Sequence, residues 1–314
     1  MRATSTSSVT GSTRTPTMLS LSSSCPTVTS DVGQREALMQ VGGSTILLTG
    51  ATSGIGRATA LSIAAAGPQR LVVHGPQDES EVAGLVGELS ERTDVVYLRA
   101  DYDDLADVAR LADDARAACP GGIDVLINNA ARPGPPARTL TGDGHEATLQ
   151  VNYLAPVVLT TLLLDTVGAG RPGRIVNVAS ATHYSASLRL DDLTWAGNGY
   201  SPAAAYARSK LALVTWTCRL ATHRPRDTVD IVSIHPGVIA TGLLHAMFSA
   251  GGDSPEHAAA NLLDVVRRDH DNGTYYDERR PATPNPVALD PVTEELLEEL
   301  TQQALAPVLP AATA

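Results

Sequence analysis

The chain has 314 residues, 43% of them hydrophobic, which suffices for one large α/β domain or two smaller ones. A formal net charge of −11 and a pI of about 5.1 argue against nucleic acid or an anionic membrane as the main partner. Three scattered cysteines indicate neither a disulfide framework nor a metal site, and they fit a reducing, cytoplasmic compartment. No apolar run approaches the roughly 18 residues that a membrane span needs.

Residues 1–42 differ in composition from the rest of the chain. More than half of the first 30 residues are Ser or Thr, and no acidic residue precedes Asp31. Such a segment cannot bury enough apolar surface to order itself, so we expect residues 1–42 to be disordered. Two alternatives are an organelle transit peptide and a start codon assigned too early, with Met39 as the true start. Residues 306–314 are expected to form a short tail.

The ordered domain, expected over residues 43–305, begins with the apolar run Ser44–Gly50, which is typical of a buried parallel strand. The glycine-rich turn Ala51–Gly56 and an alanine-rich helix, Arg57–Ala66, follow. Strand, glycine turn and helix together form a dinucleotide-binding layout. Glycines let the backbone approach a pyrophosphate, and the helix N-terminus offers unpaired N–H groups. The glycine spacing here is G-x-x-x-G-x-G.

The second and third strands, Arg70–His74 and Val95–Ala100, end near residues that would decide how a cofactor is held. The stretch His74-Gly75-Pro76-Gln77 at the end of the second strand contains neither an acid, which favours NAD, nor an arginine, which favours NADP. Arg57 and His74 either face a 2′-phosphate or are exposed polar residues at a helix start and a strand end. Asp101 either accepts a hydrogen bond from the adenine amino group or caps the next helix.

Polar and small side chains follow the fourth strand, Ile123–Ile127, and the fifth, Arg174–Ser180. Asn128–Ala131 is placed to line a cofactor cleft, and Ser180 lies at the carboxyl end of its strand, where ligands bind in open α/β sheets. Asn152 lies in an apolar helix, so its amide needs a partner. A local bond near Pro156 is the structural alternative for that side chain.

Tyr206 and Lys210 are four residues apart, so they share one face of a helix. A phenol has a pKa of about 10, and a nearby ammonium favours the phenolate and lowers that pKa. Such a tyrosine is suited to exchange a proton with a substrate oxygen. A sixth strand, Asp230–His235, leads into the turn Pro236–Thr241, which is placed to wrap a nicotinamide.

These motifs, taken in order, resemble the short-chain dehydrogenase/reductase family. They are TGATSGIG (Thr49–Gly56), NNAA (Asn128–Ala131), Asn152, Ser180, YARSK (Tyr206–Lys210) and HPGVIAT (His235–Thr241). The long interval between Ser180 and Tyr206 and the stretch Gly273–Pro291 resemble the retinol-dehydrogenase-like branch. Two residues depart from the pattern: Ala131 replaces a glycine, and Pro76 stands where that branch has arginine.

The resemblance implies a single doubly wound Rossmann-type α/β domain, an NADP or NAD cofactor, a small-molecule carbonyl/alcohol substrate and a homo-oligomer formed through the helices bearing Asn152 and Tyr206. In it Tyr206 is the general acid or base, Lys210 lowers the Tyr206 pKa, Ser180 binds the substrate oxygen and Asn152 holds a water. The expected cofactor-binding residues are Gly50, Thr52, Ser53, Gly54, Ile55, Gly56, Arg57, His74, Asp101, Tyr102, Asn129, Ala130, Tyr206, Lys210, Pro236, Gly237, Val238 and Thr241. No metal site is expected.

Two other functions keep the same fold. One is a non-redox enzyme, such as a dehydratase or epimerase, and the other is a nucleotide-sensing module without catalysis. The intact Ser180, Tyr206 and Lys210 set argues against a pure sensor. Leu243–Asp253 is expected to form a substrate lid, in which Leu244, Met247 and Phe248 suggest an apolar substrate portion. The C-terminal segment is expected to form a helix over 293–304 with Leu296, Leu297 and Leu300 facing inward.

Overall fold

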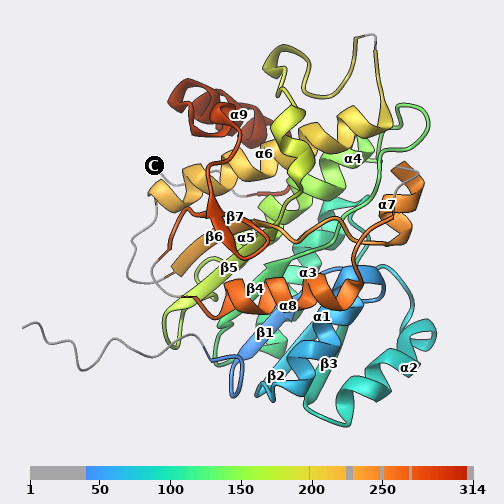
Figure 1. The fold of residues 1–314 in the computed structure, drawn as a ribbon, viewed down its shortest axis with the longest axis vertical. Coiled ribbons are helices and arrows are strands. Elements are labelled where there is room, and N and C mark those ends of the chain that lie inside the picture. The colour runs from blue at the N-terminus through green and yellow to red at the C-terminus, as the bar shows by residue number, and fades with distance from the viewer. Residues whose placement is uncertain (1–39, 198, 224–228, 248–250, 269–270, 310–314) are drawn as a thin grey trace, which may run out of the picture. The chain divides into compact units, whose positions relative to one another are not determined.

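The computed structural model describes residues 40–309 except 198, 224–228, 248–250 and 269–270 (Figure 1). Most of the Ser/Thr-rich segment 1–42 and residues 310–314 of the expected tail lie outside the described residues. The strands are β1 (Thr45–Leu48), β2 (Arg70–Gly75), β3 (Asp94–Arg99), β4 (Val125–Asn128), β5 (Gly173–Val178), β6 (Val229–His235), β7 (Tyr275–Asp277) and β8 (Arg280–Ala282). The helices are α1 (Gly54–Ala65), α2 (Glu79–Ser90), α3 (Leu105–Ala118), α4 (Ala147–Leu149), α5 (Ala155–Leu163), α6 (Pro202–His223), α7 (Gly242–Met247), α8 (Pro255–Val266) and α9 (Pro291–Leu305).

Within the described residues these strands form one eight-stranded sheet in the order β3-β2-β1-β4-β5-β6-β7-β8, parallel except for β8. The order reverses between β1 and β4, which makes the sheet doubly wound and opens a crevice at the carboxyl ends of the strands there. The expected Rossmann-type fold is confirmed. The short strands β7 and β8, which extend the sheet beyond β6, were not predicted from the sequence.

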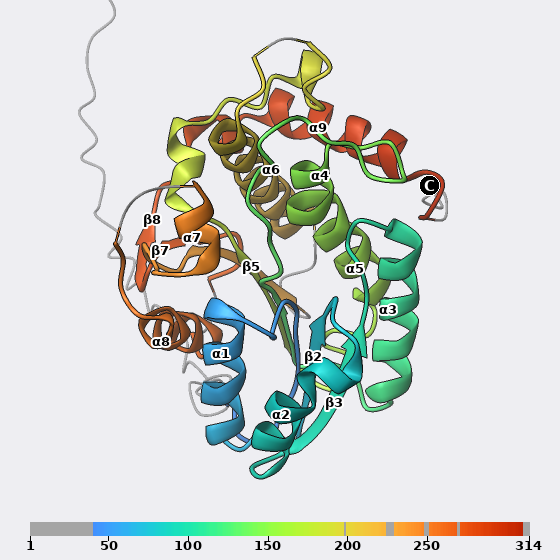
Figure 2. The ribbon, with the colours of Figure 1, turned by 90° about the vertical axis from the view of Figure 1, so that its right-hand side faces the viewer.

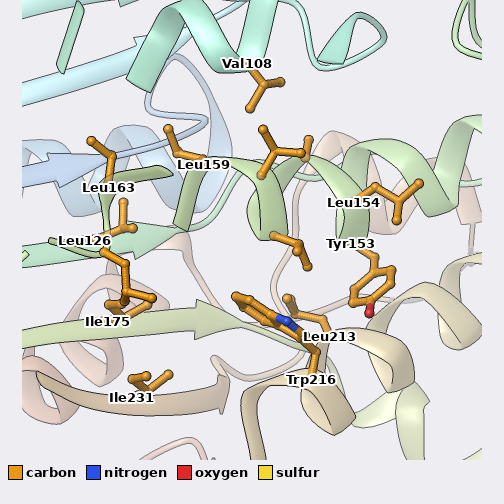
Figure 3. Packing of buried hydrophobic residues seen from close by; sticks show 14 of the residues in the cluster. Val108, Leu126, Tyr153, Leu154, Leu159, Leu163, Ile175, Leu213, Trp216 and Ile231 are labelled. Atoms are coloured by element: carbon orange, nitrogen blue, oxygen red, sulfur yellow. The ribbon is translucent and has the colours of Figure 1, made fainter. Parts of the chain in front are cut away.

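Helices cover both faces of the sheet, with α1 and α8 on one and α3, α5 and α6 on the other (Figure 2). Side chains alternate accordingly along each strand: Ile46 and Leu48 join the cluster beneath α1 and α8, whereas Leu47 joins the cluster beneath the other helices. Figure 3 shows that second cluster, where Leu126 and Ile175 of the sheet meet helical side chains. Burial on both faces fixes the positions of the strand ends that carry the site.

Helix α6 is enclosed by its own chain. Every residue from Ala205 to Cys218 is buried, and α4 and α9 pack against the helix. In α9, Leu297 points inward as expected, whereas Leu296 is 44% exposed, so that part of the expectation is wrong. No helix in the described part of the chain is long and apolar enough to cross a membrane.

Candidate active site

A cavity of about 700 Å³ lies at the carboxyl ends of β1 to β6 and gathers nearly all of the residues expected in the site. Those that line it are Gly50, Thr52, Ser53, Gly54, Ile55, Gly56, His74, Asp101, Tyr102, Asn129, Ala130, Ser180, Tyr206, Lys210, Pro236, Gly237, Val238 and Thr241. Arg57 and Asn152 are not among its lining residues. Gln77, Asp103, Arg132 and Thr182 line it as well and were not expected from the sequence.

The glycine turn before α1 is shaped for close backbone contact. A Cβ at Gly56 would lie 1.9 Å from the carbonyl oxygen of Gly50, and Gly50 itself has a φ of +64°. The amide of Asn129 donates to that same Gly50 oxygen at 3.1 Å and fixes the turn from below. Ser53 begins α1 without a side-chain capping bond, so the first N–H groups of the helix face the cavity. Such a cradle fits the pyrophosphate of a dinucleotide.

Ser180, Tyr206 and Lys210 meet on the opposite wall of the cavity. Ser180 follows β5, and α6 places Tyr206 and Lys210 one turn apart, with the Lys210 ammonium 5.8 Å from the centre of the Tyr206 ring. Lys210 Nζ donates a hydrogen bond to the carbonyl oxygen of Val178 at 2.7 Å. Ser180 and Tyr206 both line the cavity, and the Ser180 hydroxyl lies close enough to the phenol to act on its pKa.

Burial is the main cause of the pKa shifts of Tyr206 and Lys210. It raises the pKa of Tyr206 to about 12, although the hydrogen bond with Ser180 acts in the opposite direction. It lowers the pKa of Lys210 to about 7. The sequence led us to expect that Lys210 lowers the pKa of Tyr206. In the structure burial raises that pKa instead, and Lys210 does not offset the rise. The Lys210 ammonium points to Val178, and near neutral pH it is only partly charged.

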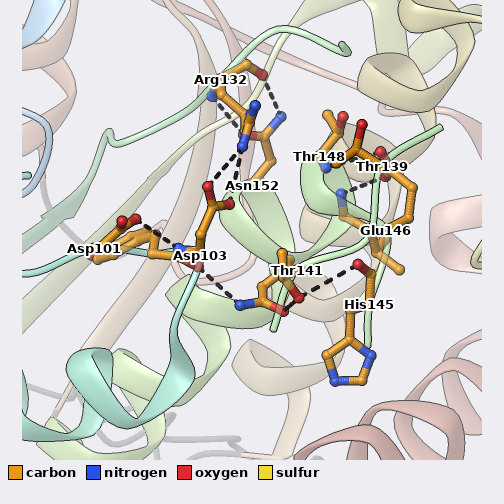
Figure 4. Close-up of polar contacts among 12 residues, drawn as sticks. Asp101, Asp103, Arg132, Thr139, Thr141, His145, Glu146, Thr148 and Asn152 are labelled. Carbon is orange, nitrogen blue, oxygen red and sulfur yellow. Dashed lines mark hydrogen bonds and ion pairs between the residues drawn. The ribbon is translucent and has the colours of Figure 1, made fainter. Parts of the chain in front are cut away.

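Asn152 lies in a π-helical turn, Gln150–Leu154, and is fully buried. Its amide nitrogen donates to the Arg132 carbonyl oxygen and to Ser209 Oγ, both at 3.1 Å, and its oxygen accepts from the Arg132 N–H at 2.8 Å (Figure 4). The amide thus joins the loop after β4 to α6, rather than making a local bond near Pro156. Arg132 also contacts both carboxylate oxygens of Asp103 at 3.0 Å, so this loop is tied to the turn after β3.

His74 lines the cavity and is buried beside the glycine turn. Its ring is 2% exposed and stacks on Tyr102 with 4.7 Å between ring centres. Nδ1 accepts from the Gly50 N–H at 3.4 Å, and Nε2 lies 3.1 Å from the Ala100 carbonyl oxygen. Burial lowers the His74 pKa to about 4, so the ring is neutral at pH 7. His74 therefore supports the glycine turn. The alternative of an exposed residue at the strand end is wrong, and a contact with a 2′-phosphate stays a prediction.

Arg57 and Asp101 differ in their relation to the cavity, because Asp101 lines it and Arg57 does not. Arg57 pairs with Glu88 of α2 at 2.7 Å, and both side chains are more than 40% exposed. Asp101 lines the cavity, and its Oδ1 accepts from the Asp103 N–H at 2.9 Å. Asp104 caps α3, so the alternative in which Asp101 caps that helix is wrong, and the adenine contact stays a prediction.

The entrance side of the cavity is apolar. Leu243 and Leu244 of α7 line it together with Val238, which is 50% exposed. Leu243 and Leu244 belong to the expected lid, Leu243–Asp253, whereas Val238 precedes it. Phe248 and the side chain of Met247 lie outside the described residues, so their part in the lid stays a prediction.

A buried polar network behind Ser180 was not anticipated from the sequence. The Asn285 N–H donates to His183 Nε2 at 3.2 Å, so the His183 proton resides on Nδ1, which donates to the Ser180 carbonyl oxygen at 2.7 Å. The Asn285 amide also donates to the carbonyl oxygens of His183 and Ala186. The segment after β8 thus holds the turn that carries Ser180.

Comparison with known proteins agrees with this fold and site. The short chain dehydrogenase family matches residues 44–251. Retinol dehydrogenase 13 of Mus musculus is 34% identical over 268 residues, which cover 79% of each chain. An uncharacterized protein from Mycobacterium paratuberculosis has a TM-score of 0.72 at 27% identity and covers 86% of this chain and 96% of its own. A short chain dehydrogenase from Burkholderia cenocepacia J2315, solved in complex with NADP, has a TM-score of 0.60 at 25% identity over 76% of this chain and 98% of its own.

The chain belongs to the short-chain dehydrogenase/reductase family, and it is similar to retinol dehydrogenases. It is therefore a dehydrogenase or reductase.

Proposed function

We propose that the protein transfers a hydride between NAD(P) and a carbonyl/alcohol substrate, with Tyr206 as the general acid or base. The observation that carries this proposal is the convergence of Ser180, Tyr206 and Lys210 on the cavity that also contains the glycine turn of α1. The NADP complex of the Burkholderia relative and the alcohol named in the retinol dehydrogenases support the cofactor and the substrate class. The nicotinamide, when bound, supplies or accepts the hydride.

The protein's own groups manage the proton and the substrate oxygen. Ser180 donates a hydrogen bond to that oxygen, where negative charge develops during reduction. Because the Tyr206 pKa is about 12, its phenol is protonated at neutral pH and can donate to the developing alkoxide. Lys210 would hold the ribose of the cofactor by a hydrogen bond. Leu243 and Leu244 exclude water and favour an apolar substrate portion.

We further propose that the cofactor is NADP rather than NAD. No carboxylate stands at Pro76 or Gln77, the two residues after β2 that line the cavity. Arg57 is released at little cost, because its exposed pair with Glu88 is worth at most about 1 kcal/mol. The Arg57→Gln variant should bind NADPH about tenfold more weakly and NADH unchanged. Arg92→Gln, at an exposed position in the turn after α2, is the control. An equal loss for both cofactors would contradict the role of Arg57.

NAD is the alternative, because one specific observation favours it. Gln77 Oε1 is a buried acceptor without a partner among the described residues, and Gln77 lines the cavity. It is suited to accept from a ribose 2′-hydroxyl. Tighter binding of NADH than of NADPH by wild type, lost in Gln77→Leu, would establish this alternative.

Turnover of a panel of apolar aldehydes with NADPH tests the reaction itself. We expect one alcohol formed per NADPH consumed. A product of unchanged oxidation state, with no net change in NADPH, would favour the non-redox alternative, in which the same residues move only a proton.

The cytoplasmic location and the homo-oligomer stay proposals. The enclosure of α6 within one chain bears on the second, because an interface cannot use a helix that is already covered. We propose that any homo-oligomer uses another face, such as the exposed apolar side chains of Leu289, Val292 and Leu296. Light scattering of wild type and of Val292→Glu tests this, and an oligomer that resists the substitution would contradict it.

A further inference from the structure

A second cavity, of about 400 Å³, lies beside the first. Thr182, two residues after Ser180, lines both cavities. The walls combine apolar side chains with hydroxyl groups, namely Trp195, Ala203, Ala207, Ser185, Ser187 and Ser201. Because α6 contributes both Tyr206 to the first cavity and Ala207 to the second, a substrate that reaches Tyr206 can extend into the second cavity.

One charged side chain, Arg208, lines this second cavity. It is 6% exposed, and its guanidinium lies 3.7 Å from the centre of the Trp195 ring. Nη1 donates to the Asp192 carbonyl oxygen at 2.8 Å. Nε is buried and has no hydrogen-bond partner among the described residues. The guanidinium therefore has an unsatisfied N–H group and belongs to a residue that lines the cavity.

Two carboxylates that act electrostatically on Arg208, those of Asp192 and Glu146, accept hydrogen bonds from backbone N–H groups. Asp192 accepts from the N–H groups of Ala196 and Gly197 at 2.6 and 3.1 Å. Glu146 accepts from the N–H groups of Thr148 and Leu149 at 3.0 and 2.8 Å. Within the described residues no carboxylate lies within ion-pair distance of Arg208.

A buried cation without a direct counter-ion is costly, because removal from water is not repaid by a partner. The backbone around it is also strained: Trp195 has a φ of +59°, a left-handed conformation that bulky residues rarely adopt. This conformation holds the indole against the guanidinium. An anionic ligand bound to Arg208 would compensate the buried charge and the backbone strain at Trp195. The planar guanidinium group is suited to bind a carboxylate.

We propose that the second cavity is a substrate subsite in which Arg208 binds a carboxylate. The substrate class is then an aldehyde, ketone or alcohol that carries a carboxylate at the far end of an apolar chain. This inference rests on the proposed function, since the first cavity is taken to hold the reacting carbonyl.

The test compares two series of straight-chain aldehydes of equal length, one ending in a methyl group and the other in a carboxylate. For each enzyme, kcat/KM with NADPH gives the ratio of carboxylate to methyl substrates. We expect wild type to prefer the carboxylate at one chain length. Arg208→Met should lower the ratio about 10- to 100-fold, as expected for a charged hydrogen bond. Arg208→Lys should retain part of the preference.

Arg189→Met is the matched control, because Arg189 is exposed and close in sequence but does not line either cavity. An equal loss of preference in this variant would point to the general field of the surface and overturn the subsite. A wild-type ratio near one at every chain length would overturn it too.

Calorimetry separates the failure of this proposal from the failure of the proposed function. Straight-chain carboxylates and the matching alcohols are titrated into the wild-type protein, a measurement that needs neither turnover nor a folded variant. Tighter binding of the carboxylate without any aldehyde turnover would support the subsite and contradict the reaction. Aldehyde turnover with no tighter binding of the carboxylate would support the reaction and overturn the subsite.

Discussion

Lys210, which lines the active-site cavity, is expected to destabilise the folded state. It is 2% exposed, and burial lowers its pKa from 10.5 to about 7. The folded state thus holds the Lys210 proton less tightly than the unfolded state. The resulting cost is fully present below pH 7 and disappears as the pH rises from 7 towards 10.5. Replacing Lys210 with methionine, which has similar length and no charge, removes this cost.

The expected gain at neutral pH follows from two opposing terms. At roughly 1.4 kcal/mol per pKa unit, burial of the Lys210 ammonium costs about 4 kcal/mol at pH 7. The variant also loses the hydrogen bond to the Val178 oxygen, worth about 1 to 3 kcal/mol. Lys210→Met should therefore raise the free energy of unfolding by about 1 to 3 kcal/mol at pH 7, while its turnover collapses.

Urea denaturation without cofactor, from pH 6 to pH 10, measures this difference. The gain of the variant over wild type should be largest at the acid end and should shrink steadily above pH 7. A variant less stable than wild type at pH 6, or a gain that grows with pH, would refute the reasoning about burial.

Two further substitutions test how the site is held. Gly56→Ala places a Cβ 1.9 Å from the Gly50 oxygen and should weaken NADPH binding more than tenfold by calorimetry, whereas Gly84→Ala, in open space on α2, should leave it unchanged. Equal affinities in the two variants would contradict a tight turn. Asn285→Ala removes the amide bonds to the turn behind Ser180 and should cost about 2 to 3 kcal/mol of unfolding free energy and lower kcat about tenfold, which denaturation and steady-state kinetics measure separately. Wild-type kcat in a destabilised variant would leave Asn285 with a structural role only.

The fold was largely predictable because its signals are local. Strands β1 to β6 are short and largely apolar, and each ends at, or directly before, a glycine, a small residue or a polar residue that marks the crevice. Strands β7 and β8 could not be predicted because each has only three residues. The turn between them also lacks the usual glycine and places Glu278 at a φ of +56°.

The parts of the site that could not be predicted depend on contacts between distant segments. Nothing near His74 in the sequence shows that Tyr102 and Ala100 will enclose its ring, so its burial could not be predicted. The same holds for the Tyr206 pKa, which depends on burial rather than on its spacing from Lys210. Arg208, inside the YARSK motif, gave no sign that it would line a second cavity, because helical spacing does not tell which neighbours surround a side chain.

The most direct test of the proposed function is aldehyde reduction by Tyr206→Phe, measured together with NADPH binding in the same preparation. The substitution removes the phenolic hydroxyl and leaves the ring that α6 packs in place. We expect NADPH to bind as it does to wild type and kcat to fall at least about 100-fold, the contribution of a general acid. Wild-type turnover in this variant would show that another group delivers the proton and would contradict the role assigned to Tyr206.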